Sequence, residues 1–253
     1  MRHGRTIAGI LCGCLLIGSC DDGGEALIGP TNESVGGIWN GTDSQTGRPV
    51  LAIATESGTL HLIRADLVQY VGTLASLGTT VTGTLDAFAP PGLAFQDGSV
   101  HGYGTVTGTI HQRRTLDAAA DFVTERGGAF GDTLTLSFAA LYYRPSSLDR
   151  IAGTFTAAGT GTGYSISGAG AVFAQDATSG CVINGAVTII DATYNAYGVS
   201  LSFASCSGED AELNGLTLTG LATLDNTGTP EQALVSVAAD GSKVARFVVL
   251  QRN

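Results

Sequence analysis

Apolar and polar residues alternate along many short segments of this chain, and this pattern restricts the folds that it can adopt. In residues 133–143 every second position from Leu134 to Tyr142 is apolar, and in residues 196–205 the same holds from Tyr197 to Phe203. Successive side chains of a β-strand point to opposite faces, so this period of two predicts half-buried antiparallel strands. Residues 116–126 alternate in the same way, which favours a strand over a helix there.

Glycine-containing turn signals separate these segments. The chain has 37 glycines among 253 residues and 13% charged residues, whereas average proteins have about 7% glycine and about 25% charged residues. This composition excludes a coiled coil, a long helical bundle and a charge-rich disordered chain. The sharpest signal, Asp240-Gly241, predicts a two-residue hairpin turn.

The strand-like segments fall into two groups, about eight before Pro145 and about eight after Arg150. A faint internal repeat supports this division. Residues 35–39 resemble 151–155, residues 52–58 resemble 172–180, and residues 81–86 resemble 218–225. We therefore expect an all-β fold of two similar antiparallel β-barrel or barrel-like modules, residues 35–150 and 151–253. One continuous sheet system is the alternative.

The N-terminus has the features of an export signal. Arg2 and Arg5 precede an uncharged apolar run over residues 6–18, which is too short to span a bilayer but suits a signal peptide. The run ends in Gly18-Ser19-Cys20, which resembles the lipobox of bacterial lipoproteins. That resemblance implies a signal peptide over residues 1–19 and lipidation of Cys20. An ordinary signal peptide cleaved nearby is the alternative. Residues 20–34 contain Gly23-Gly24, Gly29-Pro30 and few apolar side chains, so we expect a flexible tether there.

Charge narrows the choice of partners. Residues 1–19 contain two of the 12 basic residues and none of the 22 acidic ones, so their removal changes the net charge from −10 to −12. This charge disfavours nucleic acid as a partner. We expect contact with the membrane through the N-terminal lipid, and an envelope protein as partner. Asp21 and Asp22 resemble an inner-membrane retention signal, but the choice between inner and outer membrane stays open.

Two cysteines, Cys181 and Cys206, remain once the signal peptide and the lipidated residue are set aside. An even number in an exported chain favours a disulfide. If Asp191 pairs with Ala196 across a four-residue loop, the same register places the two cysteines directly opposite each other. Closing a loop of this length stabilises the fold by about 3 kcal/mol in the chain-entropy model.

Catalytic motifs are missing from the sequence. His61, His101 and His111 lack the close spacing of metal ligands, and no Gly-x-Ser-x-Gly motif occurs. We therefore predict no catalytic residue, no metal ligand and no cofactor, and we expect the three histidines at the surface or on a barrel rim. A site assembled from residues far apart in the sequence, as in a hydrolase, is the third-ranked hypothesis.

Three resemblances bear on function. Gly37-Ile38-Trp39 resembles the first-strand signature of lipocalins and implies, as an alternative function, a carrier of a small apolar ligand inside a barrel. The two-module arrangement resembles the lipid-anchored surface proteins of the transferrin-binding and factor-H-binding type. Gly180-Cys181, residues 195–201 and Cys206 resemble a region of uncharacterised proteobacterial lipoproteins. The leading expectation is a non-catalytic lipoprotein of the cell envelope with a binding or structural role.

Overall fold

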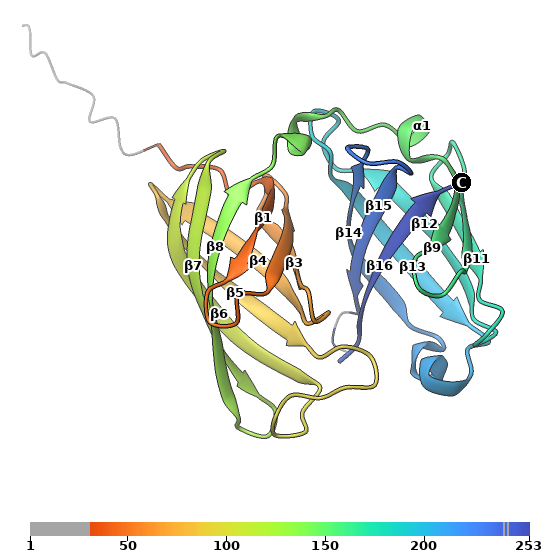
Figure 1. Cartoon of the computed structure of the whole chain (residues 1–253), viewed down its shortest axis with the longest axis horizontal. Coiled ribbons are helices and arrows are strands. Elements are labelled where there is room, and N and C mark those ends of the chain that lie inside the picture. The colour runs from red at the N-terminus through yellow and green to blue at the C-terminus, as the bar shows by residue number, and fades with distance from the viewer. Residues whose placement is uncertain (1–30, 240, 242) are drawn as a thin grey trace, which may run out of the picture.

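The computed structural model describes residues 31–239, 241 and 243–253, and in it the chain forms two closed β-barrels that lie side by side (Figure 1). Every strand pairs antiparallel with its neighbours, and the last strand of each barrel closes onto the first. The prediction of an all-β chain with two eight-stranded barrels is confirmed. The first barrel comprises β1 (Gly37–Asp43), β2 (Pro49–Ala54), β3 (Thr59–Arg64), β4 (Gln69–Leu77), β5 (Thr80–Phe88), β6 (His101–His111), β7 (Thr115–Thr124) and β8 (Ala129–Phe138).

The second barrel follows a short connection that contains the 3-10 helix η1 (Ala140–Tyr143) and the single-turn helix α1 (Leu148–Ile151). Another 3-10 helix, η2 (Gly208–Leu213), lies between two of its strands. The predicted signal peptide, Cys20 and most of the predicted tether lie outside the described residues. The strands of the second barrel are β9 (Gly153–Ala157), β10 (Gly163–Ile166), β11 (Ala171–Gln175), β12 (Val182–Ile189), β13 (Tyr197–Ala204), β14 (Thr217–Asp225), β15 (Gln232–Ala238) and β16 (Ala245–Arg252).

The alternating sequence pattern sends apolar side chains into the barrels. Along β7, buried and exposed residues alternate without a break from Leu116 to Thr124, which confirms the strand predicted for this segment. Large aromatic side chains fill the centres: Trp39, Tyr70 and Phe122 in the first barrel, and Phe155 in the second, are all buried. Burial of each such side chain contributes about 2–3 kcal/mol, so most of the stability of each barrel resides in its own interior.

The disulfide between Cys181 and Cys206 is present, but the register predicted for it is wrong by one residue. β12 and β13 pair Ile189 with Tyr197 at one end and Val182 with Ala204 at the other, which would place Cys181 opposite Ser205. Ser205 adopts a left-handed φ of 60°, and this extra residue brings Cys206 to within 4.0 Å of Cys181, measured between Cα atoms.

Two other sequence-based expectations need correction. Of the three internal repeats, only the first falls on equivalent strands, β1 and β9, whereas residues 52–54 lie in the second strand of their barrel and residues 172–175 in the third. The predicted two-residue turn at Asp240-Gly241 is also wrong. Ala238 pairs with Ala245, so the connection is longer, and Asp240 itself lies outside the described residues.

Candidate functional site

The two barrels meet along β2 and β3 of the first and β14 and β15 of the second (Figure 1). Apolar side chains from both barrels form buried clusters at this junction. One cluster contains Ile38 and Ile53 from the first barrel with Leu221 from the second, and another packs Phe88 against Ala238. The barrels are therefore joined by a packed interface as well as by the peptide chain.

A buried polar contact crosses the same interface. The Nδ1 atom of His61 on β3 lies 2.9 Å from the hydroxyl of Ser236 on β15, and that hydroxyl donates to the side-chain oxygen of Gln69 at 2.8 Å. His61 is 2% exposed and Ser236 is 0% exposed. Burial lowers the pKa of His61 from 6.5 to about 4, so its imidazole is neutral at pH 7. The expectation of a surface histidine is therefore wrong for this residue.

Beside this contact, the barrels enclose a groove of about 660 Å³. We call it the inter-barrel groove. One wall comes mainly from β3 to β6 and the other from β12, β13 and β14. The β15–β16 connection forms the lower end of the groove. Its lining includes His61, Val71, Asp86, Phe88, His101, Glu125 and Lys243.

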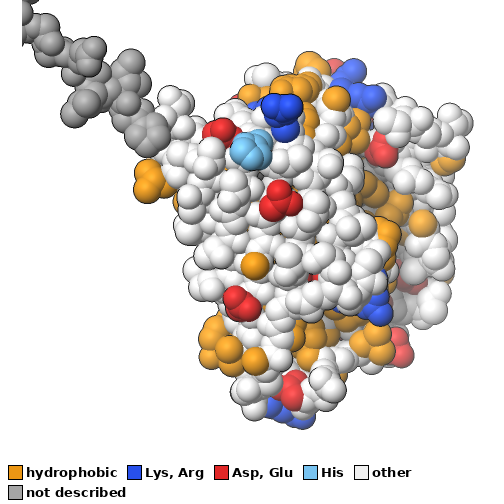
Figure 2. Space-filling view, turned by 60° about the vertical axis from the view of Figure 1, so that its left-hand side comes forward, with side chains coloured by type: hydrophobic (Ala, Val, Ile, Leu, Met, Phe, Trp, Pro, Cys, Tyr) orange, Lys and Arg blue, Asp and Glu red, His pale blue; other side chains and the backbone are white. Residues whose placement is uncertain are grey.

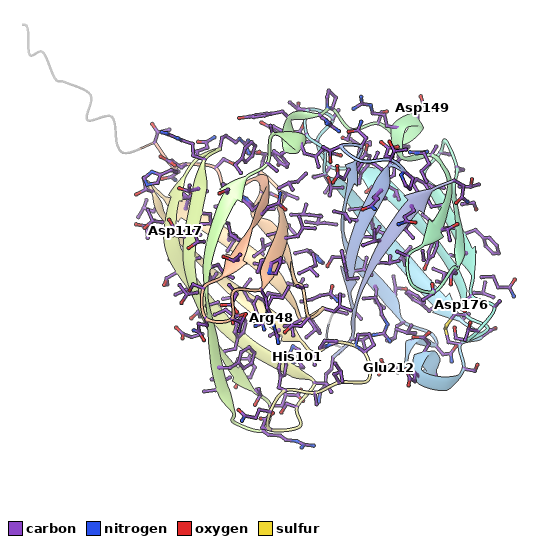
Figure 3. The ribbon with its side chains drawn as sticks, viewed as in Figure 1. Arg48, His101, Asp117, Asp149, Asp176 and Glu212 are labelled. Atoms are coloured by element: carbon purple, nitrogen blue, oxygen red, sulfur yellow. A yellow bond between two sulfur atoms is a disulfide. The ribbon has the colours of Figure 1, made fainter. Side chains whose placement is uncertain are left out.

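The charged groups of the groove gather at one end. The Nε2 atom of His101 lies 2.9 Å from a carboxylate oxygen of Asp86, and its Nδ1 lies 3.7 Å from Glu125. Lys243, from the second barrel, forms an ion pair of 2.7 Å with Glu125. Figure 3 places His101 at the lower part of the junction between the two barrels. This end of the groove therefore offers both acidic and basic groups, while Phe88, whose ring centre lies 5.2 Å from that of His101, provides an apolar surface.

This arrangement is suited to binding. Mixed apolar and polar lining at an interface between domains is typical of sites for small molecules. Ser236, which contacts the groove residue His61, has its hydroxyl buried and oriented toward the amide of Gln69. No group of three or more His, Cys, Asp or Glu side chains with the geometry of a metal site occurs among residues 31–239, 241 and 243–253.

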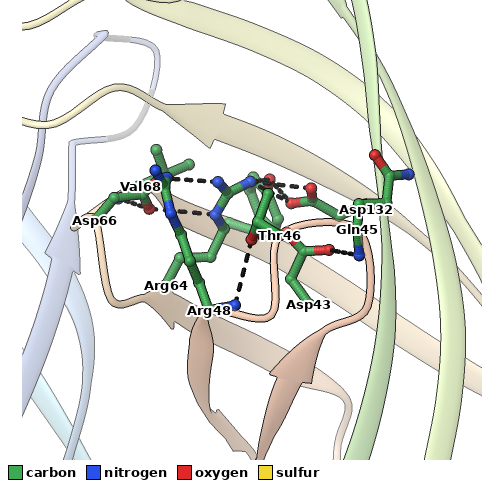
Figure 4. A network of polar contacts seen from close by, with 9 residues as sticks. Asp43, Gln45, Thr46, Arg48, Arg64, Asp66, Val68 and Asp132 are labelled. Atoms are coloured by element: carbon green, nitrogen blue, oxygen red, sulfur yellow. Dashed lines mark hydrogen bonds and ion pairs between the residues drawn. The ribbon is translucent and has the colours of Figure 1, made fainter.

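Another pocket, also of about 660 Å³, opens at one end of the first barrel. Its floor is a polar network, shown in Figure 4, in which Arg64 donates to both oxygens of Asp132 at 2.9 and 2.7 Å and to Asp66 at 2.8 Å. Tyr70 donates to Asp132 as well. Although burial opposes the charged form, contacts with Tyr70 and Asp132 raise the pKa of Arg64 above its ordinary value. We call this pocket the barrel-mouth pocket.

Aromatic side chains connect the barrel-mouth pocket to the barrel interior. Phe95 stacks on Phe130 with ring centres 4.8 Å apart, Phe130 stacks on Phe122 at 4.9 Å, and Phe122 contacts Tyr70 at 4.5 Å. Figure 2 shows hydrophobic side chains gathered at the end of this barrel opposite the first described residues. Leu93, in the loop that borders the pocket, is 62% exposed.

The structure brings only some of the sequence-predicted residues together. His61 and His101 both line the inter-barrel groove, whereas His111 lies at the far end of β6 and the disulfide does not line the groove. Trp39 fills the first barrel and donates to the carbonyl of Val35 at 3.1 Å. Ser236 and Gln69 were not among the sequence-predicted site residues. Both lie at outward positions of their strands, next to the inward-facing Val235 and Tyr70. In the sequence, a polar residue at such a position looks the same as one exposed to solvent.

Within the described residues, no helix is long and apolar enough to cross a membrane. No family model matches the sequence, and no curated protein matches it. Among solved structures, the chain is similar to the Aeromonas veronii immune modulator A, with a TM-score of 0.40 and 9% sequence identity over 89% of this chain and 97% of that chain.

Proposed function

We propose that this chain is a non-catalytic, lipid-anchored binding protein of the bacterial cell envelope, and that its binding site is the inter-barrel groove. This proposal rests on the groove itself, a cavity of about 660 Å³ at a packed interface. Its lining combines the apolar Phe88 and Val71 with the polar Asp86, His101 and Lys243. A cavity of this size matches the usual volume of small-molecule sites. The lipid anchor rests on the lipobox-like sequence that ends in Cys20.

Two features of the groove favour binding over hydrolysis. A serine nucleophile needs an exposed hydroxyl and a histidine free to accept its proton. Ser236 is buried and donates to Gln69, so the hydrogen between His61 and Ser236 comes from the Nδ1 of the histidine. His61 therefore acts as a donor to Ser236 in this arrangement and serves to hold the barrels together.

The barrel-mouth pocket supports a second candidate function, a carrier of a small apolar ligand of the lipocalin kind. Its lining includes Phe95, Phe130 and Leu93, which suit an apolar molecule. Below them, however, Tyr70 and Trp39 occupy the barrel centre. Small barrels of eight strands either hold one ligand or are filled by side chains, and these aromatic residues favour a ligand at the mouth over one inside the barrel.

Native mass spectrometry of the protein extracted from envelope membranes tests the proposal. Ala186 is exposed on the outer face of β12 and lines the inter-barrel groove, so Ala186→Trp places an indole in it. Asn184, exposed on the same strand and face but outside the groove lining, gives the matched control Asn184→Trp. We expect a bound small molecule on the natural chain and on the control, with occupancy reduced at least about tenfold in Ala186→Trp.

Equal occupancy in all three proteins would place the ligand elsewhere, and the barrel-mouth pocket would become the leading site. Absence of any bound molecule from the natural chain would leave the groove without a ligand from the envelope and contradict the proposal.

A further inference from the structure

A separate, strongly polar pocket of about 310 Å³ lies at the upper end of the second barrel, beside α1. Three of the chain's 12 basic residues line it: Arg144 from the connection between the barrels, Arg150 from α1, and Arg252 from β16. Such a concentration stands out in a chain whose net charge is −10. Figure 3 shows the position of α1 through the labelled Asp149.

Arg252 is held rigidly in this pocket. Its Nε donates to Glu231 at 2.6 Å, and its two terminal nitrogens donate to the backbone carbonyls of Ala152 at 2.7 Å and Arg150 at 2.6 Å. Its guanidinium also lies over the ring of Phe155, 4.6 Å from the centre. These contacts use three of its five N–H groups and fix the orientation of the others.

Arg144 lines the pocket with a guanidinium group that is not fully paired within the described residues. Its Nη1 atom is buried, yet it has no hydrogen-bond partner among the residues that the structure describes. Buried donors of a charged group are normally satisfied, because leaving one unmade is unfavourable. Arg150, by comparison, donates from its Nη1 to the carbonyl of Pro145 at 2.9 Å.

Acidic groups are present as well. Glu231 lines the pocket but is paired with Arg252, and Asp149 is exposed in the first turn of α1. Three guanidinium groups against two carboxylates leave a net formal charge of +1 at the pocket. Asn195, Asn226 and Tyr197 complete the polar lining.

We propose that this pocket binds a small organic anion through a carboxylate or phosphate group, with Arg144 as its principal donor. The planar guanidinium group matches both oxyanions in geometry and charge. The volume of about 310 Å³ accommodates a small molecule that bears such a group. Arg144 belongs to the connection between the barrels, so an anion bound there ties this connection to the second barrel.

Isothermal titration calorimetry of the full chain in detergent tests this inference, with inorganic phosphate, glycerol 3-phosphate and succinate as separate probes at constant ionic strength. Arg144→Met removes the donor while keeping much of the side-chain length. Arg114→Met is the matched control, because Arg114 is an exposed arginine that does not line the pocket. We expect saturable binding of at least one probe, weakened at least tenfold by Arg144→Met and unchanged by Arg114→Met.

The probe that binds most tightly then identifies the anion class. Should Arg144→Met fail to fold by circular dichroism, Arg150→Met replaces it, because Arg150 is exposed and lines the same pocket. Absence of binding by all three probes, or equal binding by the Arg144 and Arg114 variants, would overturn the inference. The inter-barrel groove is a different cavity, so this outcome leaves its proposed function untouched.

Discussion

The imidazole of His61 in the first barrel and the hydroxyl of Ser236 in the second are joined by a hydrogen bond of 2.9 Å, although the two residues are 175 positions apart in the sequence. Gly220 on β14 permits this contact, since a Cβ atom there would lie 2.7 Å from Cε1 of His61. The bond lies next to the inter-barrel groove, so the geometry of the groove depends on it.

Acidification is expected to weaken the fold through His61. The unfolded chain binds a proton at this residue near pH 6.5, whereas the folded chain does so only near pH 4. The unfolded state therefore holds more protons between these values, and the free energy of unfolding falls by about 3 kcal/mol as pH drops through this window. Denaturant unfolding at pH 7 and pH 4.5 measures the change.

His61→Gln keeps a side-chain donor but cannot titrate. The fall in the free energy of unfolding on acidification should therefore be about 3 kcal/mol smaller in this variant than in the natural chain. His111→Gln is the control, because His111 is exposed and lies away from the junction. If His61→Gln and the natural chain share the same pH profile, His61 does not couple protonation to folding.

Removal of the disulfide should destabilise the second barrel. Cys181 and Cys206 close a loop with a sequence separation of 25, and opening such a loop costs about 3 kcal/mol of stability in the chain-entropy model. We expect Cys181→Ser with Cys206→Ser to show this loss in urea unfolding. The natural chain should show a similar loss under reducing conditions, and the double variant none. An equal midpoint in oxidised and reduced natural chain would contradict this expectation.

The buried ion pair between Arg64 and Asp132 should contribute more to stability than the exposed pair between Arg48 and Asp66. Both side chains are largely buried, at 11% and 4% exposure, and Asp132→Ala leaves the guanidinium group without its main partner, which costs about 3 kcal/mol. Arg48 pairs with Asp66 at the surface, where its side chain is 49% exposed. Arg48→Ala should therefore cost less than about 1 kcal/mol. Similar losses in the two variants would show that burial does not set the strength of this network.

Lipidation should depend on Cys20 alone. We expect a fatty-acid label supplied to growing cells to appear on the natural chain and on a Cys12→Ser, Cys14→Ser variant, and to be absent from Cys20→Ser. The control pair lies inside the predicted signal peptide, whose removal the lipobox interpretation implies. Label retained in Cys20→Ser would refute the lipobox interpretation.

Fold class was predictable from this sequence because alternation is a local property. Leu116 to Phe122 alternate in the sequence, and the same residues alternate between buried and exposed in β7. Strand number followed from the turn signals between such segments. Register was less predictable, since Ser205 inserts one residue through a left-handed backbone conformation, which a serine does not signal in the sequence.

The candidate site could not be predicted in the same way. His61, Gln69 and Ser236 come from two barrels, and their proximity depends on how the outer faces of β3 and β15 pack. Arg144 and Arg252 are likewise 108 positions apart in numbering and meet only because β16 closes the second barrel next to the connection. Contacts of this kind depend on tertiary packing, which local patterns do not encode.

A fluorescence titration with N-phenyl-1-naphthylamine, an apolar uncharged probe, tests whether the inter-barrel groove binds small molecules. The titration uses residues 31–253, without the preceding segment, in their natural sequence. We expect saturable enhancement of probe fluorescence with this protein. Ala186→Trp should weaken binding at least about tenfold, while Asn184→Trp on the same face of β12 should bind as the natural chain does. Undiminished binding by Ala186→Trp, or no saturable binding by the natural chain, would contradict the assignment of the inter-barrel groove as the binding site.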